Sequence, residues 1–169
     1  MNAQSSLATS AEIGIGIAGF AGIAGVLRRR GQGAWTPHDI FRMRILLRGS
    51  FAVVLLSLLP IALATTAVEE TTQWFVASGL YAVFLALAFA VGIRQLRREL
   101  GLSTELFERS CALFLPSIAI LGFTLNIANV VIFRTAWPYL FSLVLALTLA
   151  FVQFVRLLRS LWQPPQSEA

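Results

Sequence analysis

Residues 138–155 read PYLFSLVLALTLAFVQFV, an uncharged and almost wholly apolar run that ends at Arg156. Such a run predicts a membrane-spanning helix, because roughly 20 residues at 1.5 Å each cross a hydrocarbon core of about 30 Å. Similar runs recur upstream. We therefore predict an all-α, polytopic membrane helical bundle with five transmembrane helices, or four as the alternative. The expected spans are about 5–27, 50–66, 74–93, 111–133 and 138–155.

The first of these spans is the reason for the alternative of four. Its core, AEIGIGIAGFAGIAGVL at residues 11–27, is rich in glycine, which lowers helix propensity by ~1 kcal/mol per residue relative to alanine. A secretory signal peptide carries its positive charge before the apolar region. Here no basic residue precedes the run and Arg28, Arg29 and Arg30 follow it. We therefore expect an uncleaved span with the N-terminus outside.

Composition supports one membrane domain and argues against a soluble module. Of the 169 residues, 57% are hydrophobic and 12% are charged, against roughly 45–50% and 25% in soluble domains. The spans use most of residues 1–162, which we expect to form a single transmembrane helical domain. Residues 163–169 should form a disordered cytoplasmic tail. Cys111 is the one cysteine, so an intrachain disulfide is excluded.

The basic residues predict the orientation of the bundle. The net charge of +5 could suggest nucleic-acid binding, but a nucleic-acid-binding protein gathers such charge on a soluble module. Here every basic side chain is arginine, and all arginines except Arg134 fall on one side of the predicted spans. Cytoplasmic flanks carry the excess of positive charge. We therefore expect a cytoplasmic C-terminus, arginine loops that bind anionic headgroups, and a multi-pass protein of a bacterial inner membrane.

Tryptophans fall at or near the predicted span ends, where amphipathic rings prefer the headgroup region. They are expected to act as interfacial anchors: Trp35, Trp74, Trp137 and Trp162. A packed position within a loop is the alternative for Trp35.

Small residues in the first span predict a helix-packing face. Pairs four residues apart, such as Ala18 with Gly22, let helix backbones approach closely in lipid. The expected face comprises Gly16, Ala18, Gly19, Ala21, Gly22 and Gly25. The partner is either another helix of the same protomer or a second protein. The three-residue glycine step drifts around the helix, so it does not choose between them.

A second pattern consists of polar residues near the predicted outer ends of the spans. Asn126 and Asn129 lie about one helical turn apart, and side-chain amides in lipid seek interhelical hydrogen bonds. Glu12 is either solvated at the interface or functional, since ionisable residues within spans mark function. Together they could line an outward-facing vestibule. Its expected members are Glu12, Ser78, Tyr81, Asn126, Asn129 and Arg134.

Catalytic machinery is not expected. His38 is the one histidine and lies beside Asp39 in the first turn of a predicted helix, with no positioned partner or pocket around it. No motif for a cofactor, a metal or a nucleophile occurs in a suitable context. We therefore expect a non-catalytic membrane component that associates with itself or with a partner through its glycine-rich face. The alternative is an oligomeric channel or transporter subunit for a small ion or solute.

Overall fold

The computed structural model describes residues 2–31, 37–99 and 106–162, and over these ranges it is helical apart from short connections. The elements follow the chain as α1 (Ala3–Gly31), α2 (Pro37–Ala64), α3 (Glu70–Glu99), α4 (Leu106–Ala128), the π-helix η1 (Asn129–Phe133) and α5 (Ala136–Trp162). The helix α2 begins at Pro37, whose fixed φ suits a first helical position.

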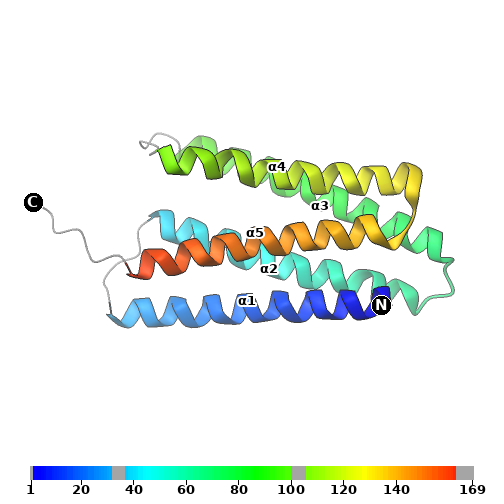
Figure 1. The fold of residues 1–169 in the computed structure, drawn as a ribbon, viewed down its shortest axis with the longest axis horizontal. Helices are drawn as coiled ribbons and strands as arrows, with labels where there is room; N and C mark the ends of the chain where they lie inside the picture. Colours follow the sequence, from blue (N-terminus) through cyan, green and yellow to red (C-terminus); the bar gives the residue numbers. More distant parts are fainter. Residues whose placement is uncertain (1, 32–36, 100–105, 163–169) are drawn as a thin grey trace, which may run out of the picture.

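The five α-helices run up and down in a bundle (Figure 1). At one end lie the N-terminus, the connection between α2 and α3, and the turn that joins η1 to α5. The opposite end, called the arginine end below, carries Arg28 to Arg30 of α1 and Arg156 and Arg159 of α5. The helix α5 packs on α1, α2 and α4, and α3 packs chiefly on α4 and also meets α2. Within the described ranges, α1 packs only on α2 and α5.

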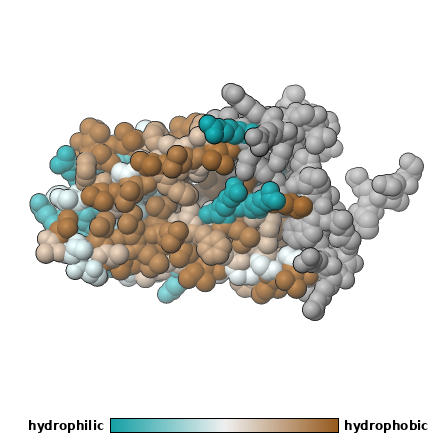
Figure 2. Space-filling model, turned by 180° about the vertical axis from the view of Figure 1, so that it is seen from behind, coloured by the Kyte–Doolittle hydropathy of each residue, from teal (hydrophilic) through white to brown (hydrophobic). Residues whose placement is uncertain are grey.

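All five helices are long and apolar enough to span a membrane, which confirms the prediction of five spans. The candidate spans are Ala3–Val26, Met43–Ala64, Glu70–Val91, Pro116–Phe133 and Ala136–Arg159. Large apolar side chains cover much of the surface, as Figure 2 shows. A soluble protein rarely exposes such large apolar patches. The protein is therefore a multi-span membrane protein in contact with the lipid bilayer.

The buried side chains form two clusters along the bundle. The larger lies toward the N-terminal end and joins α1, α2, α3 and α5 around Tyr81 and Tyr139. The smaller lies toward the arginine end, where Ala21, Leu46, Ala150 and Leu157 join α1, α2 and α5. Among the described side chains, α3 contributes to the first cluster and not to the second.

A proline in α2 explains a hydrogen bond at the centre of the larger cluster. Pro60 has no N–H, so the carbonyl of Leu56, four residues earlier, lacks its normal helical donor. The buried hydroxyl of Tyr139 donates to this carbonyl instead. One turn further on, Nε2 of Gln73 donates to the carbonyl of Pro60 at 2.8 Å. Neighbouring helices thus satisfy the carbonyls around the proline, as spanning helices require.

We expect Tyr139→Phe to lower the free energy of unfolding by about 1–2 kcal/mol, the cost of leaving a buried carbonyl without its donor. In a Pro60→Ala background, residue 60 regains an N–H that can bond to the Leu56 carbonyl. There the same substitution should cost less than about 0.5 kcal/mol. A double-mutant cycle of unfolding in mixed micelles measures the coupling, and equal losses in both backgrounds would contradict this role for Tyr139.

Candidate functional site

The predicted outer polar cluster includes a buried hydrogen-bonded centre built on Asn129, the first residue of η1. Its amide nitrogen donates to Oγ of Ser78 on α3 at 2.7 Å and to the carbonyl of Thr135 at 2.9 Å. The N–H of Thr135 donates back to Oδ1 of Asn129 at 3.0 Å. Asn129 and Ser78 are fully buried. This side chain therefore joins α3 to the turn between α4 and α5.

Two further predicted residues, Tyr81 and Asn126, are buried beside this centre. The hydroxyl of Tyr81 donates to the carbonyl of Ser142 on α5 at 3.0 Å, and its ring packs edge-to-face on Tyr139 with 5.4 Å between centroids. The amide nitrogen of Asn126 donates to the carbonyl of Gly122 in its own helix at 2.8 Å. These groups face one another inside the bundle and bond internally, so they do not line an open vestibule.

The last two predicted members, Glu12 and Arg134, lie elsewhere. Arg134 is exposed, with its guanidinium carbon 5.5 Å from the centre of the Phe75 ring and a left-handed backbone at φ 49°. Glu12 is exposed on α1, which packs on neither α3 nor α4 in the described ranges. The expected vestibule of six residues is therefore divided. Hydropathy places residues at similar depths but does not determine which helices are neighbours.

The glycine-rich face predicted for α1 is divided in the same way. Ala21 is buried, and Ala18 and Gly25 are half-buried. Gly16, Gly19 and Gly22 are instead exposed, and a Cβ at any of them would meet no atom within 4 Å. The close approach occurs at Gly14, where a Cβ would lie 3.1 Å from the carbonyl oxygen of Ser50 on α2. Packing within the protomer thus uses a different side of α1 from most of its glycines.

Part of the exposed surface of α1 carries polar and small residues where a lipid-facing helix normally carries large apolar ones. Residues three, four or seven positions apart share a helix face. Exposed residues at these spacings from Glu12 therefore form one surface with it. We call it the Glu12 face, and it consists of Ser5, Ala8, Thr9, Glu12, Gly16 and Gly19, together with the large apolar residue Ile15. Within the described part of the chain, Glu12 has no hydrogen bond or ion pair. Its carboxyl group is thus available to a group outside the protomer.

The predicted tryptophan anchors have different environments. Trp137 is 53% exposed at the start of α5 and can reach the membrane interface. Trp74 is 3% exposed, because its ring packs on Tyr139 at 5.9 Å and its indole N–H donates to Glu70. Trp74 therefore packs in the core, whereas the sequence predicts it as an anchor at the membrane interface. Trp35 and the side chain of Trp162 lie outside the described residues.

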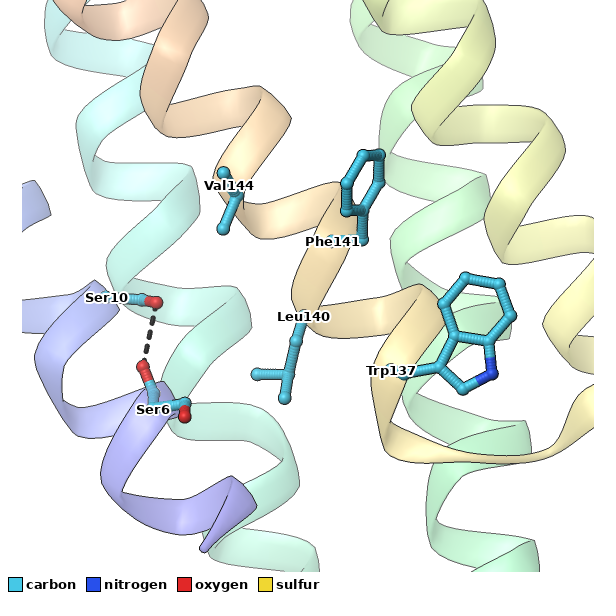
Figure 3. A pocket seen from close by; sticks show the side chains of 6 residues that line it. All are labelled: Ser6, Ser10, Trp137, Leu140, Phe141 and Val144. Atoms are coloured by element: carbon cyan, nitrogen blue, oxygen red, sulfur yellow. Dashed lines mark hydrogen bonds between the residues drawn. The ribbon is translucent and has the colours of Figure 1, made fainter. Parts of the chain in front are cut away.

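Two apolar hollows open on the surface, and neither holds a titratable side chain. One, of about 350 Å³, lies between α1 and α5 and is lined by Ser6, Ser10, Trp137, Leu140, Phe141 and Val144 (Figure 3). The hydroxyl of Ser10 in this hollow already donates to the carbonyl of Ser6. The other, of about 280 Å³, lies between α3 and α4 and is lined by apolar side chains only. Hollows of this chemistry suit acyl chains.

The described residues contain no group of three or more histidine, cysteine or acidic side chains that could hold a metal ion. Of the predicted polar residues, those of the Asn129 centre are internally bonded, whereas the Glu12 face is open. Comparisons with protein-family models, with curated proteins and with solved structures gave no match.

Proposed function

We propose that this protein is a non-catalytic component of a bacterial inner membrane, with its arginine end in the cytoplasm, and that it associates with itself through the Glu12 face. The observation that carries the proposal is the place of Glu12. It lies nine residues beyond Ala3 in the span Ala3–Val26, or about 14 Å along the helix axis at 1.5 Å per residue. Glu12 therefore lies deeper in this candidate span than the outer end expected from the sequence, and its side chain is exposed.

An ionisable side chain at this depth is costly unless it finds a polar partner. A second copy of α1 supplies one. In a two-fold dimer the same surface meets itself, so the two Glu12 carboxyl groups come together and a protonated one can donate to the other. Gly16 and Gly19, four and seven residues further along, leave open space where the facing backbone can approach. The paired carboxyl groups and the close backbone approach at the glycines therefore both favour a dimer formed through the Glu12 face.

A second candidate function is an oligomeric channel or transporter subunit for a small ion or solute. The same face favours it, because Ser5, Thr9 and Glu12 form a polar row along α1 that a ring of copies could turn toward a shared axis. Inside the described part of the protomer, Asn129 and Tyr81 use their polar groups in buried hydrogen bonds and so do not supply such a row. Stoichiometry separates the two functions, since a dimer supports the association component and a ring of four or more supports the channel.

We expect Gly16→Leu to weaken self-association about tenfold or more, which corresponds to about 1.4 kcal/mol, because leucine separates the facing backbones. Glu12→Ala should weaken self-association to a similar degree. Glu12→Gln should weaken it less, because two glutamine side chains can hydrogen-bond to each other. Ala90→Leu is the matched control, since it adds similar bulk at an exposed position on α3. Native mass spectrometry and energy transfer between labelled copies in vesicles measure the association. A wild-type protein that stays monomeric in both would refute the proposal.

A further inference from the structure

The helices α2 and α3 are joined at the N-terminal end of the bundle (Figure 1), and burial along α3 decreases from there toward the arginine end. Trp74, Ala77 and Tyr81 are at most 3% exposed and belong to the same buried cluster as Ala52 and Leu56 of α2. The same side of α3 continues through Phe84, Ala88 and Val91, all of which are exposed. The space-filling view from this side shows a recess in the apolar surface, called the apolar cleft below (Figure 2).

The α2 wall of this cleft ends in basic residues. Arg48 lies four residues before Ala52, so the two share a helix face of α2, and Ala52 belongs to the cluster that includes residues of α3. Arg44 lies one turn further out, and both side chains are exposed. On α3, Arg94 follows Val91 by three residues and is also exposed. Figure 2 views the molecule from the α2–α3 side and shows hydrophilic side chains on both sides of a recess in the apolar surface.

The depth of Arg48 places its charged group where an anion of the membrane interface can bind it. The span of α2 begins at Met43, so Arg48 lies five residues, or about 7.5 Å, inside it. Arginine at such a depth extends its charged head toward the interface while its stem stays in apolar surroundings. No carboxylate in the described ranges forms an ion pair with Arg44, Arg48 or Arg94. Phosphate is the anion at this level, and a guanidinium group can bind it through two hydrogen bonds.

We propose that the cleft between α2 and α3 is a binding site for an anionic phospholipid of the leaflet at the arginine end. The phosphate binds Arg44 and Arg48, with Arg94 on the opposite wall, and an acyl chain lies along Phe84, Ala88 and Val91. Apolar walls that lead directly to unpaired arginines match a molecule with a chain and a negative head. A free phosphate ion would leave the apolar part of the cleft empty, so we assign the site to a lipid. This site is independent of the Glu12 face.

The test is native mass spectrometry of delipidated protein titrated with phosphatidylglycerol or phosphatidylcholine. We expect Arg48→Gln to lower the affinity for phosphatidylglycerol about fivefold, the share of one well-placed charge. The Arg44→Gln, Arg48→Gln double variant should lower it about 25-fold. Ala88→Trp should also weaken binding, because it fills the cleft without changing charge. Glycerol phosphate, which has the head without the chains, should not compete.

Arg159→Gln is the matched control, because Arg159 is an exposed arginine of the same end but lies on α5. It should leave affinity within about twofold of the wild type, since a distant charge contributes little to one site. Equal losses of phosphatidylglycerol affinity in Arg159→Gln and Arg48→Gln would show that binding depends on the total positive charge of this end. That result would overturn the proposed site. Unchanged binding in Ala88→Trp would overturn the place given to the acyl chain. Equal affinity for phosphatidylcholine would overturn the role of the arginines.

Discussion

Gly14→Leu is expected to lower the free energy of unfolding by about 3 kcal/mol, at the upper end of what overpacking costs. Even a Cβ at this position would lie 3.1 Å from the carbonyl oxygen of Ser50 and 3.1 Å from a methyl group of Val54. Ordinary carbon contacts are about 3.5–4.0 Å. The carbonyl belongs to the backbone of α2 and cannot move alone, so a leucine must push α1 away from α2.

Gly16→Leu supplies the control for this effect, because a Cβ at Gly16 meets no atom within 4 Å. Unfolding of the monomer, measured in mixed micelles dilute enough to prevent association, should change by no more than about 0.5 kcal/mol. The same variant is expected to lose self-association in vesicles. Gly14→Leu and Gly16→Leu thus separate packing within the protomer from packing between protomers. Similar stabilities for the two variants would show that α1 does not pack on α2 through Gly14.

The comparison between Gly14 and Gly16 also shows what the sequence could predict. Length and apolar content identify each span separately, and these two properties were enough to predict the five helices. The side that a helix buries depends on its neighbours. Gly16, Gly19 and Gly22 follow a three-residue step, which drifts around a helix of 3.6 residues per turn. Leu7, Gly14 and Ala21 lie seven residues apart and all face the bundle.

The candidate site was predictable to a similar extent. Asn126 and Asn129 were expected to seek interhelical hydrogen bonds, and Asn129 does bond to Ser78 on α3. The bond of Tyr139 to Leu56 was missed, although Pro60 indicates a carbonyl in need of a donor. Grouping Glu12 with the asparagines assumed that α1 lies beside α4, whereas α5 lies between them. Helix order in a bundle is set by packing and loops, which apolar runs do not reveal.

Asn129→Leu is expected to lower the free energy of unfolding by about 3 kcal/mol. The substitution keeps a side chain of similar size but removes the amide that bonds to Ser78 and to both backbone groups of Thr135. Buried polar groups left unpaired cost about 1–3 kcal/mol each, and interhelical bonds in lipid recover part of this through other partners. The turn would then have to hold Arg134 in its left-handed conformation with less support.

Asn126→Leu provides a matched control in the preceding turn of the chain. Asn126 and Asn129 are both fully buried, yet the amide nitrogen of Asn126 donates only to Gly122 in its own helix. Its Oδ1 is buried without a hydrogen-bond partner among the described residues. Removing an unpaired polar atom offsets the loss of one bond, so the free energy of unfolding should change by less than about 1 kcal/mol. Thermal and denaturant unfolding of both variants in micelles measure the difference. A loss at Asn126 as large as that at Asn129 would mean that burial of an amide, rather than its bonds across the α4–α5 turn, is what stabilises this end of the bundle.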